Sequence, residues 1–392
     1  MYKEAFIQGL ACGSIVASII IKQSSRRSDA STRAGSLGLV GNTPIITIRS
    51  LSTLTGCQIL AKCEFLSLAG SSKDRVALNI IEHAEEEGLI TPHTGCTLFE
   101  GTMGSTGISL TTIGRAKGYK VHVVLPDDTA REKYELITAL GATVERVRPV
   151  SIIDRNHFVN VAQRRAEEMS LQAAQTRSQA KGYFCDQFEN LANFQAHYNT
   201  TGPEIYQQCG TDIHAFVMGA GTGGTIAGVS RYLKPRIPNI KIVLADPQGS
   251  GLYHRVLHGV LYSATESEGT RKRHQVDTIV EGIGINRITM NWKQLEIGRG
   301  ETMQYVDDAV RVSDQEAVDM SRYLMAQEGL FLGSSSAVNL VAAVRVARTL
   351  GPGHSIVTLL CDSGSRHLTK FWNDDYLKGM GIAPDASRVM SL

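Results

Sequence analysis

Hydrophobic and polar positions follow two different periods along most of the chain. The mostly apolar run at residues 119–125 (YKVHVVL) predicts a buried strand. The spacing of Ala77, Ile80, Ile81 and Ala84 places four apolar side chains on one helical face and predicts a helix that ends near Gly88. The same patterns predict helices and strands that alternate: strands at 143–147, 215–218 and 240–244, and helices at 131–140 and 226–233. This alternation is typical of an α/β fold with a largely parallel sheet.

Composition narrows the class of protein. The chain has 392 residues, of which 42% are hydrophobic, and a formal net charge of +2, so it is long enough for two globular domains and gives no argument for nucleic-acid binding. Seven cysteines without a C-x-x-C pair indicate neither a disulfide framework nor a zinc site, and we expect a reducing compartment and no metal. The polar stretches 171–182 and 266–273 are interpreted as surface insertions.

The N-terminus differs from the rest of the chain. Residues 5–21 are uncharged and mostly apolar, and as a helix they would be about 26 Å long, just short of a bilayer core. Lys22, Arg26, Arg27 and Arg33 follow this run, so the positive-inside rule leaves the body of the protein in the cytosol. We expect a short membrane anchor in the outer mitochondrial membrane; a cleaved secretory signal and a matrix presequence are the alternatives.

Lys73 is the first candidate for chemistry. Ser71 and Asp74 fit a capping pattern that places Lys73 in the first turn of the predicted helix. The positive end of a helix disfavours an ammonium, and desolvation would lower the amine pKa further, which is what a Schiff-base lysine needs. The alternative is a solvated lysine on a surface helix.

Two loops rich in glycine predict anion-binding sites. Residues 100–107 (EGTMGSTG) enter an apolar helical pattern, and such a loop offers free backbone N–H groups to a carboxylate or phosphate. In residues 219–225 (GAGTGGT), Gly219, Gly221 and Gly224 fit G-x-G-x-x-G, and Asp246 follows at about the spacing of a dinucleotide site. A single phosphate fits the same loop. A nicotinamide site would leave Lys73, the first loop and residues 362–364 without a role, whereas a single-phosphate cofactor uses all of them.

These segments occur in the order of a known family. They are GNTP at 41–44, SSKDR at 71–75, QFEN at 187–190, TTGPE at 200–204, GTGGT at 221–225, DP at 246–247, EGIG at 281–284, GSSS at 333–336 and DSG at 362–364. The chain resembles the fold-type II (tryptophan synthase β-like) pyridoxal-phosphate enzymes, and specifically the cysteine synthases (O-acetylserine sulfhydrylases) with their cystathionine β-synthase relatives. The N-terminus and the first loop look most like the fungal mitochondrial cysteine synthase 2 branch.

The resemblance implies a role for each candidate residue. Lys73 would form the Schiff base with pyridoxal 5′-phosphate and then act as the base that removes the substrate α-proton. Ser105 would bond the cofactor ring oxygen and Ser363 the pyridine nitrogen. The cofactor phosphate would be held by Gly221, Thr222, Gly223, Gly224 and Thr225. The substrate carboxylate would be held by Thr102, Gly104, Ser105, Thr106 and Gln187.

The resemblance also implies an architecture and a reaction. A larger domain would combine residues 35–66 and 187–392, a smaller one would span 67–186, and the cofactor would lie in the cleft between them, in a chain that forms a homodimer. The reaction would be β-replacement, in which O-acetyl-L-serine and sulfide give L-cysteine and acetate. Met103 and Ser105 depart from the Ser and Asn of the family pattern. They leave two alternatives open: another β-elimination or replacement (cystathionine β-synthase or cysteine desulfhydrase), or a membrane-tethered, weakly catalytic binding protein.

Overall fold

The structure is a computed structural model that describes residues 35–263, 276, 278–296 and 305–392. Of these, residues 35–39 and the described residues from 40 on belong to separate units, and both sheets belong to the second. The predicted anchor at 5–21 and the predicted insertion at 266–273 lie outside the described residues. None of the helices in the described part of the chain has the length and apolarity that a membrane span requires.

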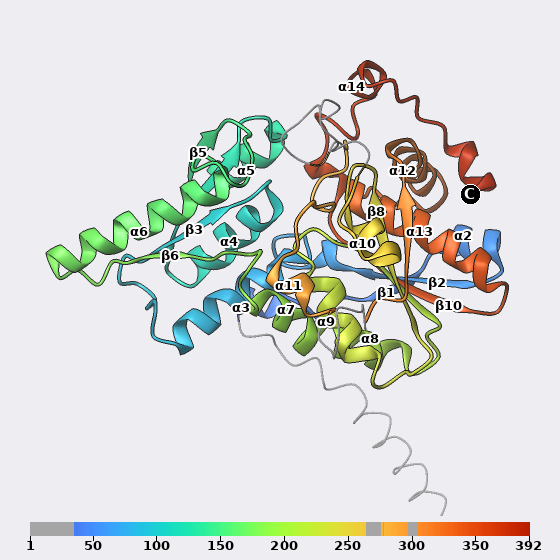
Figure 1. Ribbon diagram of the computed structural model, residues 1–392, viewed down its shortest axis with the longest axis horizontal. Coiled ribbons are helices and arrows are strands. Elements are labelled where there is room, and N and C mark those ends of the chain that lie inside the picture. The colour runs from blue at the N-terminus through green and yellow to red at the C-terminus, as the bar shows by residue number, and fades with distance from the viewer. Residues whose placement is uncertain (1–34, 264–275, 277, 297–304) are drawn as a thin grey trace, which may run out of the picture. The chain divides into compact units, whose positions relative to one another are not determined.

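The larger sheet has six strands (Figure 1). Within this sheet β1 pairs antiparallel with β2, and every other neighbouring pair is parallel, which confirms the prediction of a largely parallel α/β fold. The order across the sheet is β1 (Ile45–Thr47), β2 (Gln58–Cys63), β10 (Ser355–Leu360), β7 (Ala215–Gly219), β8 (Lys241–Pro247) and β9 (Asp308–Val312).

Helices cover both faces of this sheet. Successive side chains of β7 enter two different cores: Ala215 and Val217 join one hydrophobic cluster, and Phe216 and Met218 join the other. Because strand side chains alternate between faces, a strand buried on both sides is apolar throughout. The helices of the first cluster are α2 (Arg49–Thr55), α12 (Asp314–Glu328) and α13 (Ser334–Leu350), and those of the second are α8 (Gly202–Cys209), α9 (Gly224–Leu233) and α10 (Leu252–His258).

The smaller sheet has four parallel strands, in the order β5 (Thr143–Val147), β4 (Lys120–Pro126), β3 (Thr97–Gly101) and β6 (Gly182–Phe184). Helix α6 (Phe158–Thr176) packs on β3, β4 and β6, and α4 (Ser105–Ala116) packs on β3 and β4. Helix α3 (Lys73–Glu86) packs on α4, and α5 (Arg131–Ala139) follows β4. The division into domains at residues 67–186 and at 35–66 with 187–392 stays a prediction.

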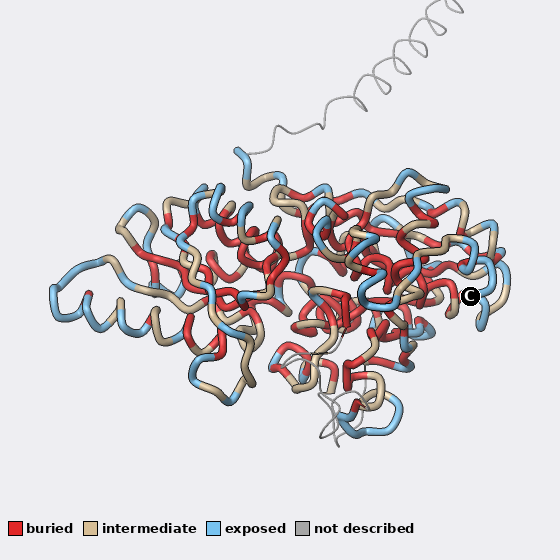
Figure 2. Tube along the Cα trace, turned by 90° about the horizontal axis from the view of Figure 1, so that it is seen from above, coloured by how far each residue is buried: buried red, intermediate tan, exposed pale blue. Residues whose placement is uncertain are grey.

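The remaining elements are short: α7 (Ala192–Ala196), α11 (Met290–Lys293) and α14 (Asp374–Gly379) are helices, and η1 (Ser36–Leu39), η2 (Glu64–Leu66), η3 (His197–Thr201), η5 (Gly364–Arg366) and η6 (Ala386–Ser391) are single turns. Buried stretches run through the middle of the trace in Figure 2, and exposed stretches lie along its outer edges.

Residues 171–176 of the predicted surface insertion are mostly exposed and form the last turns of α6. Ala and Gln are strong helix formers, so the polarity of this stretch is compatible with a helix. One local prediction is wrong: the capping pattern at the start of α3 fails. The N-cap residue is Ser72, and the carboxylate of Asp74 accepts a hydrogen bond from the Ala69 amide at 2.7 Å instead of capping through Ser71.

Candidate active site

Lys73 is the first residue of α3, and the start of this helix is attached to the end of β10. Ser71 pairs with Asp362 in an isolated bridge, and the Ser72 amide donates to the Cys361 carbonyl at 3.3 Å. Burial lowers the pKa of the Lys73 amine, and the nearby carboxylates of Asp362 and Glu64 offset this only in part. The structure therefore holds a lysine that loses its proton more readily than a solvated one.

An ionic network fixes the second residue after Lys73. Arg75 lies 2.8 Å from Glu64 and 2.6 Å from Glu204, and Lys62 lies 2.8 Å from Glu204. Burial opposes ionisation of Glu204, but hydrogen bonds from Arg75 and Lys62 outweigh it and lower the pKa of Glu204 to about 2. These contacts join α3 to β2, η2 and α8, so Lys73 extends from an anchored helix.

Three positions between β7 and the first turn of α9, at residues 221, 223 and 224, require glycine. A Cβ on Gly221 would lie 2.3 Å from the Gly282 carbonyl oxygen, and one on Gly224 would lie 2.1 Å from Asn193 Oδ1. Gly223 has φ +85°, which side-chain-bearing residues rarely adopt. Helix α9 begins at Gly224, so its first N–H groups lack partners within the helix and can hold a phosphate.

Buried side chains form hydrogen bonds to two threonines of this segment, Thr222 and Thr225. Asn193 donates to Thr222 Oγ1 at 2.8 Å, and His197 Nε2 lies 3.1 Å from Thr225 Oγ1. His197 is fully buried. Burial first, and then the charges of Lys73 and Arg75, lower the pKa of His197 well below its usual range, so it acts as a neutral hydrogen-bonding group.

The loop between β3 and α4 forms a second amide cradle. Helix α4 begins at Ser105, and the Gly104 amide donates to Thr102 Oγ1 at 3.2 Å. Thr106 Oγ1 donates to Gln187 Oε1 at 2.5 Å, and the Gln187 amide donates to Glu100. Burial raises the pKa of Glu100 well above its usual value. The hydrogen bonds of Gln187 therefore hold its side chain beside the start of α4.

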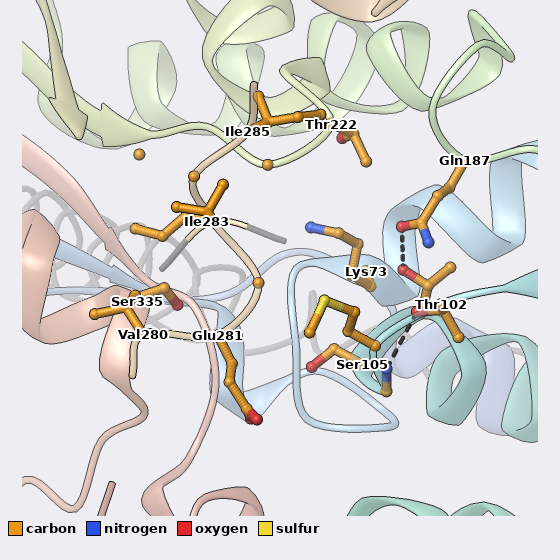
Figure 3. A pocket seen from close by; sticks show the side chains of 18 of the residues that line it. Lys73, Thr102, Ser105, Gln187, Thr222, Val280, Glu281, Ile283, Ile285 and Ser335 are labelled. Carbon is orange, nitrogen blue, oxygen red and sulfur yellow. Dashed lines mark hydrogen bonds between the residues drawn. The ribbon is translucent and has the colours of Figure 1, made fainter. Parts of the chain in front are cut away.

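One pocket of about 440 Å³ brings these parts together, a size in the range of small-molecule sites. In Figure 3 the Lys73 side chain lies between Thr222 of one loop and Ser105 of the other. The predicted site residues that line the pocket are Lys73, Thr102, Gly104, Ser105, Thr106, Gln187, Gly221, Thr222, Gly223 and Thr225.

Two predicted residues are not among those that line the pocket. Gly224 is buried behind the loop, against Asn193, and the Ser363 hydroxyl accepts a hydrogen bond from the Ser365 amide at 3.3 Å. Their neighbours Gly223 and Asp362 do line it. The roles given to all the predicted site residues stay predictions.

The sequence interpretation missed a cluster of charges in the pocket wall. Asp362, Glu281, Lys133 and Lys370 all line the pocket, and His367 lies between the first two. His367 was not among the predicted site residues. In the sequence, the only sign of a role for His367 is its position five residues after Asp362. The contact between the two side chains depends on the fold.

The residues present fit a cofactor that carries an aldehyde and a phosphate. An aldehyde requires an amine that can be unprotonated, and burial lowers the pKa of Lys73. A phosphate requires convergent N–H groups, which the loop before α9 can supply. Its backbone is packed so closely that a Cβ at Gly221 would collide with the Gly282 carbonyl oxygen.

Comparison with known proteins gives concordant results. A family model described as "Pyridoxal-phosphate dependent enzyme" matches residues 37–362. "Cysteine synthase 2" of Emericella nidulans is 59% identical over 342 residues, which are 86% of this chain and 78% of the relative. "Cysteine synthase 2" of Schizosaccharomyces pombe is 53% identical and covers 94% of this chain and 90% of the relative.

A solved structure supports the same assignment. The O-acetylserine dependent cystathionine beta-synthase from Helicobacter pylori superimposes with a TM-score of 0.70 at 31% identity, covering 86% of this chain and 97% of that one. The family model, the relatives and the fold agree, and the resemblance expected from the motifs is confirmed. The chain belongs to the pyridoxal-phosphate-dependent enzymes.

Proposed function

We propose that this chain makes L-cysteine from O-acetyl-L-serine and sulfide and releases acetate. The observation that carries the proposal is the single pocket in which Lys73, the glycine loop before α9 and the amide cradle before α4 meet. Relatives named cysteine synthase at 53% and 59% identity support this choice among the reactions of the family.

The proposed roles follow from the chemistry of each group. The N–H groups at residues 221–225 hold the cofactor phosphate, and those at the start of α4 hold the substrate carboxylate with Thr102, Thr106 and Gln187. The bound cofactor supplies an electron sink for the bond that breaks at the substrate Cα. Lys73 Nζ, whose pKa is lowered by burial, accepts the α-proton when it is unprotonated.

The test is cysteine formation by the purified chain loaded with pyridoxal 5′-phosphate. O-acetylserine alone should change the visible absorption of the cofactor, and added sulfide should restore it while cysteine and acetate appear in equal amounts. Lys73→Ala should abolish both changes, and Lys120→Ala, which removes an exposed lysine, should leave them intact. Product only with homocysteine in place of sulfide would favour the cystathionine β-synthase alternative instead.

We also propose that the chain acts at the mitochondrion, anchored in the outer membrane through residues 5–21 with its catalytic part facing the cytosol. A Saccharomyces cerevisiae relative, 52% identical over 338 residues, has the word "mitochondrial" in its name. The basic residues after the apolar run support the orientation. Protease treatment of intact mitochondria tests it: a chain that resists digestion until the outer membrane is opened would contradict the proposed orientation.

We further propose a homodimer, as the resemblance to the family implies. Sedimentation of the purified chain at two concentrations gives its mass directly. A monomer at both would contradict the proposal.

A further inference from the structure

Buried charged side chains form a connected cluster in one wall of the pocket. His367 Nε2 lies 3.2 Å from a carboxylate oxygen of Asp362, and Nδ1 lies 3.6 Å from Glu281. The exposed fractions of the His367, Asp362 and Glu281 side chains are 2%, 7% and 9%. Glu281 also forms an ion pair with Lys133, whose side chain is 3% exposed.

The pair of His367 and Asp362 is tightly enclosed. A Cβ on Gly333 would lie 2.0 Å from Asp362 Oδ1 and 2.6 Å from His367 Nε2, so the backbone before α13 lies directly against both groups. Such a pair cannot separate without moving the backbone around it.

Asp362 also touches the cradle at the start of α4. Ser105 Oγ donates to Asp362 Oδ2 at 3.3 Å, and Ser105 is the first residue of that helix. The proposed function seats the substrate carboxylate at this cradle. A fixed carboxylate therefore lies beside the place where a second carboxylate must bind, and two like charges a few ångströms apart repel strongly where water is excluded.

The charges that face His367 show how this repulsion can be offset. His367 contacts Asp362, at the end of β10, and Glu281, in the loop at 278–285. Three cations act on these two carboxylates: Lys133 of α5 on both, Lys370 after η5 on Glu281, and Arg366 of η5 on Asp362. Lys133 is already paired with Glu281. Burial opposes ionisation of Asp362, but the charge of His367 and its hydrogen bond outweigh this and keep the pKa of Asp362 below its usual range.

We propose that His367 is a positioning residue whose contact with Asp362 offsets the charge of that carboxylate and so allows the site to accept the α-carboxylate of the amino-acid substrate. The inference rests on the proposed function only in placing that carboxylate at the start of α4. It follows that replacing His367 by a neutral side chain weakens binding of a substrate carboxylate and leaves binding of an uncharged analogue unchanged.

The test compares two ligands that differ in one charge. L-alanine carries the carboxylate and cannot undergo β-elimination, and L-alaninamide lacks the negative charge. Binding of each to the cofactor-loaded chain is followed by the visible absorption of the bound cofactor. His367→Gln should weaken L-alanine at least about tenfold, because Asp362 then keeps an uncompensated charge in a site shielded from water, and should leave L-alaninamide nearly unchanged.

A double variant separates charge from structure. Asp362→Asn with His367→Gln removes both charges and should restore L-alanine binding to within about threefold of the wild type, which a purely structural role for His367 would not produce. His122→Gln is the matched control, because it removes a histidine that lies 3.3 Å from Glu145 outside the pocket.

Equal weakening of both ligands by His367→Gln, or a double variant as weak as the single one, would overturn the inference. If His367→Gln does not fold, His367→Lys, which keeps a cation beside Asp362, supplies the decision: it should hold the ratio of L-alanine to L-alaninamide affinity within about threefold of the wild type, and a ratio at least about tenfold lower refutes the inference. A wild type that binds L-alanine, and whose variants behave as expected, but that forms no cysteine would refute the proposed function alone.

Discussion

Replacing Glu204 by Gln tests the ionic network that anchors the helix of Lys73. The pKa of Glu204 is about 2 in the fold, against an ordinary value of 4.5. Each pH unit between the two corresponds to about 1.4 kcal/mol, so the carboxylate contributes about 3 kcal/mol to the free energy of unfolding at neutral pH. Because the pKa is lowered in the fold, this contribution is complete above pH 4.5 and disappears as pH falls through 2.

The assay is urea unfolding of wild type and Glu204→Gln at several pH values, followed by tryptophan fluorescence. We expect the variant to be less stable by about 3 kcal/mol at pH 7, and the difference between the two proteins to shrink steadily below pH 4.5. Glu135→Gln is the control, because its ion pair with Arg131 is exposed, with side chains 51% and 71% accessible, and should change nothing measurable.

A difference of the same size at pH 7 and near pH 2 would refute the reasoning, since only the ionised carboxylate is stabilised by Arg75 and Lys62. A stability change as large in Glu135→Gln would refute it as well, because that pair lies in water.

Three further outcomes follow from the structure. Lys73→Ala should lower cysteine formation at least about a thousandfold, measured with saturating cofactor, because its amine is the group proposed to take the α-proton; activity within tenfold of wild type would contradict its role. Gly224→Ala should cost about 2 kcal/mol or more in thermal unfolding, since its Cβ would lie 2.1 Å from Asn193 Oδ1, whereas Gly379→Ala, with nothing within 4 Å, should be neutral. Burial raises the pKa of Asp246 to about 7 from 3.8, so the folded chain keeps a proton that the unfolded chain loses, and stability falls as pH rises between the two. Asp246→Asn should remove this loss of about 4 kcal/mol, and a variant less stable than wild type at pH 8 in urea unfolding would show the argument to be wrong.

The parts of the site that the sequence predicts are local ones. The glycine loop before α9 and the cradle before α4 are each contained in fewer than ten consecutive residues, so backbone chemistry alone identifies them. The alternating strands were also predicted, because β7 is apolar along its whole length and β8 is apolar at residues 242–245.

The parts that the sequence does not predict depend on distant contacts or on competing local signals. Ser105 and Asp362 are 257 residues apart in the chain, and His367 gains its role only when the loop carrying Glu281 folds against it. In α6, polarity suggested an insertion while helix propensity decided the conformation. The Asp74 carboxylate accepts hydrogen bonds from the Ala69 amide and from Ser109, which is 35 residues away, instead of closing the expected capping box.

The position of β10 has a consequence for synthesis on the ribosome. This strand is the last in sequence among those described, yet it lies between β2 and β7 in the middle of the larger sheet. Roughly 290 residues separate the end of β2 from the start of β10, so at ordinary translation rates one edge of β2 stays unpaired for about 15 to 60 s. During that interval a nascent chain exposes a hydrophobic strand edge, the kind of surface that chaperones bind and that aggregation exploits.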